Sequence, residues 1–380
     1  MTSKLSSEIL TYKLGKFVFS AKYSSNKLLP LLIESQVLYK TVNDLPVLPR
    51  IASQIQKELI KRSIFSTAAI EGNPLSEEKV SQIIENSAKI QNTERAQKEI
   101  QNLKNAYDFL EKMKSSKSFM KIPEKLIRNI HRLITLDIEY KDNIPGTFRS
   151  HIVRVGDSEH GGVYTPPKIV QDIKMIVKHF IAWINADKMI SLDPILRAAI
   201  AHYYIGLIHP FADGNGRTAR FVEALLLQTS GIKFIPVMLS NFYYQNVDDY
   251  YWAFSKSIKN KERDITPFLE FVLRGVIKSL NEIKEHITFH IRDLTLRDYY
   301  HFLYSKKKIT HRQYDFLIFL IDKHDTVFII KELFSKSPFS VLYKKVSPST
   351  ARRDITNLLK LNLIKTEKNN CFSLNMNALE

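Results

Sequence analysis

Two apolar helical stretches of this chain meet at a loop that neither stretch can cross as a helix. The first stretch ends at Ile208, and Pro210 interrupts it because proline lacks an amide hydrogen and clashes with the preceding turn. Residues 213–216, Asp-Gly-Asn-Gly, follow with two glycines that can adopt positive φ angles. Apolar residues at helical spacing then resume. The segment therefore predicts a helix, a tight loop and a second helix whose first amides point into the loop.

Helical spacing of apolar residues recurs over most of the chain, and glycine is scarce, with 11 residues in 380. Helices are predicted near residues 51–67, 96–110, 126–134, 169–184 and 195–208, and as a pair between 247 and 284. Ser76 is expected to cap a further helix, with two glutamates in its first turn. The length exceeds one ordinary core, so we expect a mainly α protein of two or three domains.

The helical pattern breaks between Asp142 and Pro167. Residues 152–155 are short and β-prone, and residues 163–165 could return the strand. Gly156 and residues 161–162 favour turns between them. This pattern predicts a β-hairpin.

The C-terminal part, from about His301, has three short helical segments followed by two predicted strands around a polar turn at residues 368–370. A helix start at 346–350 and a helix over 351–360 resemble the recognition element of a winged helix. Three basic residues of that helix could contact phosphates, namely Arg352, Arg353 and Lys360. DNA binding through residues 346–370 and a small protein-docking module both remain open.

The overall composition sets limits on partners and location. A net charge of +17 fits general solubility, or an acidic or phosphate-rich partner. No apolar run approaches the ~18 residues of a membrane span, and residues 1–15 lack the apolar stretch of a signal peptide. A single cysteine, Cys371, excludes internal disulfides and a cysteine metal cage. We therefore expect a cytoplasmic protein without a membrane partner.

The loop between the two apolar helices carries the residue types that phosphate chemistry needs. A helix N-terminus attracts anions through its free amides and its dipole. Arg217 and Arg220 share one helical face, and two guanidinium groups suit a di- or triphosphate. Asp213 is an oxygen ligand of the kind Mg²⁺ prefers, and His209 can act as a base near neutral pH. The segment predicts a base, a metal ligand and an anion site.

Residues 209–220, His-Pro-Phe-Ala-Asp-Gly-Asn-Gly-Arg-Thr-Ala-Arg, resemble the signature of the Fic family at every fixed position. The resemblance implies a protein adenylyltransferase, which moves AMP from ATP to a Ser, Thr or Tyr hydroxyl of a protein target or of the chain itself. It also implies that His209 deprotonates that hydroxyl. Asp213 would hold Mg²⁺, with Mn²⁺ as a substitute, between the α- and β-phosphates.

The same resemblance assigns the phosphate contacts. The loop amides around Gly214, Asn215 and Gly216 would form the anion hole. Arg217 would hold the β-phosphate and Arg220 the γ-phosphate. This agrees with the chemistry of phosphoryl transfer, which depends on positioning and charge neutralisation.

An upstream segment, from Thr67 to Gly72, resembles the family's inhibitory motif Ser/Thr-x-x-x-Glu-Gly/Asn. From the residues alone, Glu71 ends a helix whose dipole disfavours a carboxylate there, so a partner is expected. The resemblance implies that Glu71 pairs with Arg220 and blocks the γ-phosphate position. Relatives with this glutamate can also remove AMP, with the glutamate aligning a water, so a hydrolase on the same site remains open.

Residues 146–149, Gly-Thr-Phe-Arg, precede the predicted hairpin and resemble the start of the Fic flap. In the family this flap covers the nucleotide and aligns the target by strand addition, for which an exposed edge is suited. The further nucleotide contacts that the resemblance implies are Val153, Arg154, Val155, Gly156, Tyr250 and Tyr251.

These expectations combine into one architecture: a Fic helical core with a β-hairpin flap, followed by a C-terminal winged-helix domain. Residues 1–110 would form an N-terminal helical region with the inhibitory motif, 111–290 the catalytic core and 300–380 the winged-helix-like domain. A homodimer remains open, as does a DNA-binding regulator that uses the core as a sensor.

Overall fold

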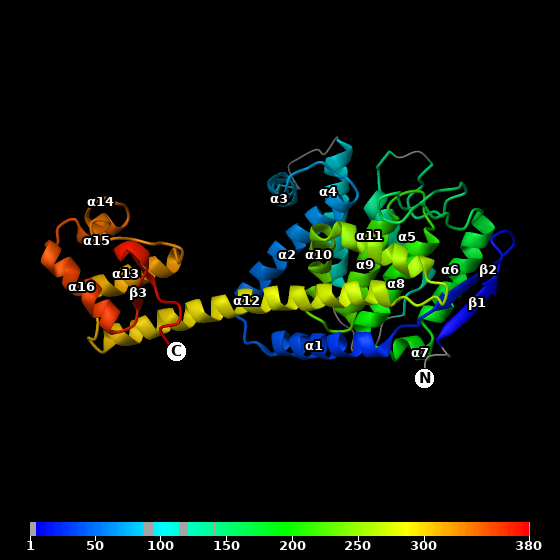
Figure 1. Cartoon of the computed structure of the whole chain (residues 1–380). Helices are drawn as coiled ribbons and strands as arrows, with labels where there is room; N and C mark the ends of the chain where they lie inside the picture. Colours follow the sequence, from blue (N-terminus) through cyan, green and yellow to red (C-terminus); the bar gives the residue numbers. More distant parts are fainter. Residues whose placement is uncertain (1–4, 87–93, 114–120, 140–141, 380) are drawn as a thin grey trace. The chain divides into compact units, whose positions relative to one another are not determined.

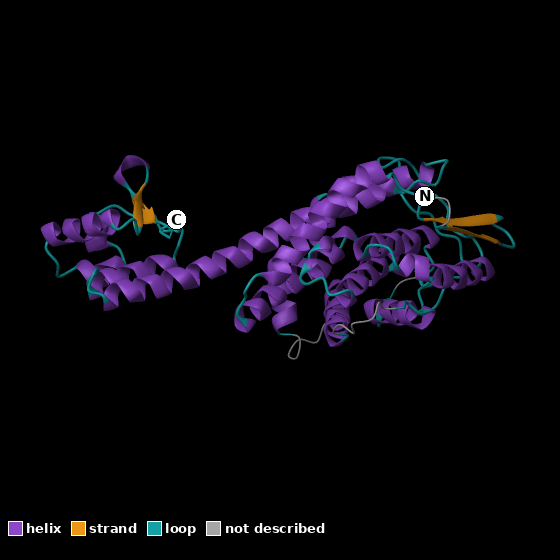
Figure 2. Cartoon of the chain, turned by 90° about the horizontal axis from the view of Figure 1, so that it is seen from below, coloured by secondary structure: helices purple, strands orange, loops and turns teal. Residues whose placement is uncertain are grey.

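The structure is a computed structural model, and it describes residues 5–86, 94–113, 121–139 and 142–379. The chain divides into two compact units, Met1–Lys284 and Glu285–Glu380. Within the described residues, strands are confined to two antiparallel hairpins and the remainder of the regular structure is helical (Figures 1 and 2). The prediction of a mainly α fold is confirmed. No helix in the described ranges is long and apolar enough to cross a bilayer.

The first unit contains most of the helices that the sequence predicts. Its elements are β1 (Ser6–Leu10), β2 (Lys16–Ser20), α1 (Ser25–Asp44), α2 (Pro49–Ile70), α3 (Glu77–Glu85), α4 (Arg95–Lys112), α5 (Glu124–Thr135), α6 (Val170–Ile184), α7 (Asp187–Ile190), α8 (Pro194–Ile208), α9 (Asn215–Thr229), η1 (Ile235–Val237), α10 (Leu239–Gln245) and α11 (Val247–Lys259). A long helix, α12 (Thr266–Ser305), begins in this unit and ends in the second. Ser76 caps α3 as predicted, because its side chain accepts a hydrogen bond from the amide of Lys79.

The helices α8 and α9 form the centre of the first unit. Most residues of both are buried, whereas α3 and α11 bury one face each. α8 is apolar nearly all round, as expected for a helix inside a helical assembly, and α9 packs against it. α5 and α2 then pack on α9, and α6 packs on α8 (Figure 1). This packing fixes the predicted loop between α8 and α9 from several sides.

The N-terminus departs from the predicted helical region. Residues 6–10 and 16–20 pair as an antiparallel hairpin, with Ser6 opposite Ser20. Phe19 is fully buried against Phe180, Trp183 and Tyr204. Residues 1–110 are therefore not helical throughout. Phe17, Val18 and Phe19 form a β-prone apolar run, but a run this short cannot be told from part of a helix by its pattern alone.

The prediction of a β-hairpin at residues 152–165 is wrong except for one pair of residues. Val155 and Tyr164 exchange two backbone hydrogen bonds, with N···O distances of 2.9 and 2.8 Å. The rest of this flap is irregular because Gly156, Gly161 and Gly162 adopt φ angles of 93°, 97° and 93°. A Cβ at Gly156 would lie 2.7 Å from the carbonyl oxygen of Gly162, so this close crossing needs glycine.

The second unit has its own core and its own hairpin. Besides the end of α12, its elements are α13 (His311–Asp322), α14 (Glu332–Ser335), α15 (Phe339–Tyr343), α16 (Pro348–Lys360), β3 (Ile364–Thr366), η2 (Lys368–Asn370) and β4 (Phe372–Leu374). The predicted helix start is confirmed, since Ser347 caps α16 by accepting from the amide of Thr350. The two predicted strands are confirmed as well, with Ile364 opposite Leu374. Winged-helix membership stays a prediction.

Candidate active site

The loop between α8 and α9 is held in a tight conformation. His209 has φ 48° and ψ 59°, a left-handed conformation that costs a residue with a side chain about 1 kcal/mol or more. Arg149 stabilises this conformation, because its Nε donates to the carbonyl of His209 at 2.8 Å and its amide donates to Pro210 at 3.0 Å. Arg149 belongs to the segment that the sequence places at the start of the flap.

Asn215 closes the loop from within. Its side-chain amide donates to the carbonyl of Phe211 and its side-chain oxygen accepts from the amide of Phe211, both at 2.9 Å. The residue is 2% exposed and begins α9 directly after Gly214, which has φ 74°. The side chain of Asn215 therefore shapes the loop, so any anion contact from this position would come from its backbone.

His131 supports the loop from α5, and sequence reasoning missed it. Its ring stacks on Phe211, with centroids 3.7 Å apart and planes 3° from parallel. Nδ1 accepts from the amide of Gly146 at 2.9 Å, so Nε2 carries the proton and donates to the carbonyl of Asp213 at 2.9 Å. A lone histidine on a helix gives no sequence signal for such a role.

Acid is expected to destabilise the chain in part through His131. Burial lowers the pKa of this fully buried ring to about 4, below its ordinary value of about 6.5. The unfolded chain therefore binds more protons between those pH values, and stability falls as pH falls. We expect His131 to account for about 2 kcal/mol of the loss between pH 8 and pH 5. Urea unfolding at both pH values should show a smaller loss in His131→Asn; an equal loss would contradict this assignment.

His209 is arranged as a neutral base. Its Nδ1 lies 3.3 Å from the carbonyl oxygen of Gly206, which can only accept, so the proton resides on Nδ1 and Nε2 keeps a free lone pair. Burial first, and Arg149 to a lesser extent, lower the pKa of His209 to about 4, against the opposing effects of the hydrogen bond to Gly206 and of Glu71 and Asp213. The ring is therefore neutral at physiological pH and can accept a proton through Nε2.

Glu71 and Arg220 form the ion pair that the sequence predicts. Arg220 Nη2 lies 2.6 Å from Glu71 Oε1, although 149 residues separate them. Thr67 adds two acceptors to the same guanidinium, its hydroxyl at 2.8 Å and its carbonyl at 3.2 Å. Burial would raise the pKa of Glu71, but Arg220 and Arg217 outweigh it and hold the carboxyl below its ordinary value. The carboxylate of Glu71 is therefore charged and fixed in place by Arg220.

The carboxylate of Glu71 lies over the first turn of α9. A Cβ at Gly216 would be 2.3 Å from Glu71 Oε1, so the carboxylate touches the backbone where the free amides of α9 begin. A helix N-terminus is an anion site. Glu71 therefore occupies the position at which the loop could receive a phosphate.

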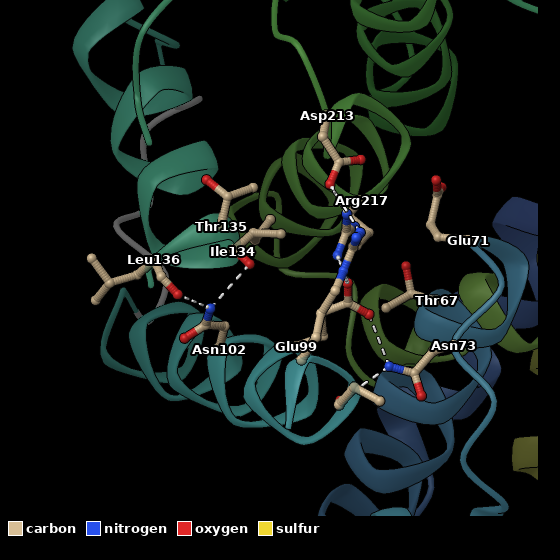
Figure 3. Close-up of polar contacts among 12 residues, drawn as sticks. Thr67, Glu71, Asn73, Glu99, Asn102, Ile134, Thr135, Leu136, Asp213 and Arg217 are labelled. Atoms are coloured by element: carbon tan, nitrogen blue, oxygen red, sulfur yellow. Dashed lines mark hydrogen bonds and ion pairs between the residues drawn. The ribbon is translucent and has the colours of Figure 1, made fainter. Parts of the chain in front are cut away.

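Arg217 lies beside this position and turns toward α4 (Figure 3). Its Nη2 donates to Asp213 Oδ2 at 3.0 Å. No cluster of three or more His, Cys, Asp or Glu side chains able to hold a metal occurs in the described part of the chain. Mg²⁺ often binds one carboxylate together with substrate phosphates, and Asp213, 19% exposed at the loop, fits that mode.

A cavity of about 540 Å³ opens next to the loop. The predicted site residues that line it are Glu71, Arg154, Val155, Gly156, His209, Gly216, Arg220, Tyr250 and Tyr251. The predicted residues that do not line it are Thr67, Gly72, Val153, Asp213, Gly214, Asn215 and Arg217. The cavity thus brings together the base, the ion pair, part of the flap and the tyrosine pair, which come from four separate segments.

Tyr250 is fixed from below the cavity by a buried chain of polar groups. Its hydroxyl lies 2.9 Å from His202 Nε2, and His202 Nδ1 lies 3.0 Å from Glu223. Tyr243 donates to the same carboxylate at 3.0 Å. The aromatic wall of the cavity is therefore held by interactions of α8, α9, α10 and α11.

His160 closes the opposite wall, and sequence reasoning missed it as well. Its Nδ1 lies 2.9 Å from Asp157 within the flap, and its Nε2 lies 3.1 Å from Asp248 on α11. Both ring nitrogens can donate to these carboxylates only in the protonated imidazolium. His160 thereby ties the flap to α11.

The contact between the flap and α11 is expected to weaken as pH rises. The two carboxylates, Asp157 first, raise the pKa of His160 above its ordinary value, and the imidazolium is lost above that raised pKa. An NMR titration should give His160 a midpoint above about 6.5, and Asp157→Asn should lower that midpoint. Asp249→Asn, on the same exposed turn of α11, serves as the control and should leave the midpoint unchanged; equal midpoints in all three proteins would refute the contact.

Comparison with known proteins places this site in context. Residues 121–227 match the model of the Fic/DOC family. The chain is 35% identical over 177 residues to protein adenylyltransferase fic-1 of Caenorhabditis elegans, a match that covers 46% of this chain and 33% of that protein. It is 30% identical over 218 residues to protein adenylyltransferase Fic of Aedes aegypti, covering 57% and 40%. The matches thus span two fifths or less of these relatives' lengths.

Solved structures share the fold. A Fic family protein from Desulfovibrio desulfuricans G20 superposes with a TM-score of 0.58 at 18% identity, covering 93% of this chain and 97% of that chain. A Fic-1 fragment from Caenorhabditis elegans superposes with a TM-score of 0.55 at 26% identity, covering 70% and 74%. The first likeness concerns the fold alone.

Proposed function

The chain carries a domain of the Fic/DOC family, and from its site we propose a protein adenylyltransferase that moves AMP from ATP to a hydroxyl of a protein. One observation carries the proposal: the Glu71–Arg220 pair lies at the N-terminus of α9, beside the neutral base His209. The names of the relatives, protein adenylyltransferases, point to the same activity.

In the proposed reaction His209 Nε2 takes the proton of the target hydroxyl as that oxygen bonds to the α-phosphorus of ATP. The bond from that phosphorus to the oxygen bridging the β-phosphate breaks, and pyrophosphate leaves. Arg220 and the first amides of α9 offset the charge on the phosphates, which is where most of the catalysis in such transfers arises. Asp213 would hold Mg²⁺, which neutralises phosphate charge when bound.

The proposal includes a restraint. Arg220 donates through Nε and Nη2 to Thr67 and Glu71, and the carboxylate of Glu71 covers the anion site at Gly216. A triphosphate would meet a negative charge there and lack a free guanidinium. The restrained chain is therefore expected to transfer slowly. A cytoplasmic location, which supplies ATP, is part of the same proposal.

The decisive test compares ATP labelled at the α- or the γ-phosphate. Adenylyl transfer by the Glu71→Gly protein incorporates the α-label and not the γ-label into protein. Incorporation of the γ-label would indicate a kinase and overturn the proposal. The same assay with labelled GTP, CTP and UTP identifies the base that the cavity accepts.

A hydrolase that removes AMP from proteins is a second candidate. The side chain of Glu71 keeps 29% exposure and lines the cavity with His209, so it could align a water molecule there. Self-modified Glu71→Gly protein would be the substrate. Release of AMP on addition of the wild-type chain, but not of more Glu71→Gly protein, would favour this reaction.

The second unit supports a separate candidate activity, DNA binding. Arg352, Arg353 and Lys360 of α16 are all exposed and free to meet phosphates. A mobility shift of promoter fragments that weakens with salt, and is lost when both arginines become alanine, would support it. Without any salt-dependent shift, the unit would remain a protein-docking module.

A further inference from the structure

A carboxylate outside the cavity joins the inhibitory segment to the signature arginine Arg217. This carboxylate belongs to Glu99 on α4, which points toward Arg217 (Figure 3). Glu99 is 7% exposed. Its Oε2 accepts from Asn73 Nδ2 at 2.9 Å, and its Oε1 accepts from Arg95 Nε at 3.1 Å. The same Oε1 lies 3.7 Å from Arg217 Nη1. One buried side chain of α4 thus lies between the inhibitory segment and α9.

Arg217 receives charge compensation from Glu99 while the donors on its Nε and Nη1 stay unused. The guanidinium is buried, and its Nε and Nη1 have no hydrogen-bond partner among the described residues. At 3.7 Å, Glu99 is too distant for a hydrogen bond but close enough to stabilise a buried cation. Buried donors without partners are costly, so a site that keeps two of them is poised for a ligand.

Asn73 connects Glu99 to the inhibitory segment. It follows Glu71 by two residues, after the turn at Gly72. Besides Glu99, its Nδ2 donates to the carbonyl of Ala96 at 3.0 Å, and its Oδ1 accepts from the amide of Leu75 at 3.2 Å. The turn that follows α2 is therefore anchored to the first turn of α4.

α4 is itself fixed one turn further along, which keeps Glu99 in place. Asn102 donates to the carbonyls of Ile134 and Leu136 at 3.3 and 2.7 Å, where α5 ends. Thr135, at the same place, lies against Gly214 of the loop. α4, which carries Glu99, is thus held to the end of α5, and that end lies against the loop.

We propose that Glu99 is a positioning residue that fixes Arg217 for the phosphates beyond the α-phosphate and, through Asn73, ties that arrangement to the position of Glu71. The inference rests on the proposed function for the identity of the ligand. It predicts that loss of the Glu99 charge weakens binding of ATP and spares binding of AMP, which lacks those phosphates.

The test is nucleotide binding by calorimetry in the Glu71→Gly background, which needs no transfer reaction. Glu99→Gln is expected to raise the Kd for ATP about tenfold, because a misplaced Arg217 loses about one charge-assisted hydrogen bond to a phosphate, and to leave the Kd for AMP within about twofold. Glu111→Gln, an exposed acid on the same helix, is the matched control and should change neither. An unchanged Kd for ATP, or an equal loss for ATP and AMP, overturns the proposal. If Glu99→Gln fails to fold, Glu99→Asp serves instead, because its shorter side chain moves the carboxylate away from Arg217. The same difference between the Kd values for ATP and AMP is expected for it.

The link to Glu71 is tested by a second variant. Asn73→Ala should raise self-labelling severalfold in the otherwise wild-type chain and add nothing in the Glu71→Gly background. If Asn73→Ala leaves the rate of self-labelling unchanged in the otherwise wild-type chain, Asn73 does not connect Glu99 to the position of Glu71. A chain that shows the nucleotide contrast but never transfers AMP would contradict the proposed function and leave the role of Glu99 in binding intact.

Discussion

Replacing Glu71 with glycine is expected to raise self-labelling by α-labelled ATP about a hundredfold, equivalent to about 2.7 kcal/mol of restraint removed. The change frees the guanidinium of Arg220, which Glu71 holds at 2.6 Å. It also removes a negative charge from the contact with Gly216, where α9 presents its free amides. Both effects favour a bound triphosphate, and His209 stays neutral, since loss of Glu71 removes an effect that raises its pKa.

Two further variants separate charge from bulk. Glu71→Gln keeps the size of the side chain and loses its charge, so it should fall between the wild-type chain and Glu71→Gly. Glu77→Gln, an exposed acid at the start of α3, should label like the wild-type chain. ATP should also raise the melting temperature of Glu71→Gly more than that of the wild-type chain, because the ligand then pairs the buried Arg220. Equal labelling by all four proteins would refute the restraint.

Local signals in the sequence predicted the parts of the site that are local in the chain. Pro210 and the glycines of 213–216 specify a break between two helices, and the structure has that break. Ser76 and Ser347 specify helix starts through their own side chains. The Glu71–Arg220 pair joins residues 149 apart, and the residues alone predicted only that Glu71 needs a partner. The resemblance to a family supplied which one.

The supporting residues could not be predicted because each is ordinary in isolation. His131, Glu99 and His160 occupy positions where a polar residue is common, and their roles arise only when distant segments meet. The flap shows the opposite error. Residues 152–155 have the composition of a strand, but the positive φ angles of Gly156, Gly161 and Gly162 limit pairing to Val155 and Tyr164. Side-chain preference was outweighed there by backbone geometry.

Replacing His209 is expected to lower transfer about a thousandfold in the Glu71→Gly background, within the range found for the loss of a general base. The choice of substitute matters, because position 209 has φ 48°. Asparagine tolerates the left-handed region better than alanine, and its side-chain amide could still donate toward the carbonyl of Gly206. It offers no basic nitrogen in place of Nε2. His209→Asn therefore removes the base with little disturbance of the loop.

Measuring the binding of ATP distinguishes loss of the base from a change in the conformation of the loop between α8 and α9. His209 would contact the target hydroxyl, whereas Arg220 and the amides of α9 would contact the phosphates, so His209→Asn should bind ATP within about twofold of its parent. Burial holds the pKa of His209 well below its ordinary value, and loss of Glu71 lowers it further, so the acid limb of the parent's pH profile should lie at low pH and vanish with the base. Transfer at the parent's rate would assign proton removal to another group. Loss of both transfer and ATP binding would instead mean that His209, held by Arg149 through its carbonyl, is needed for the shape of the anion site.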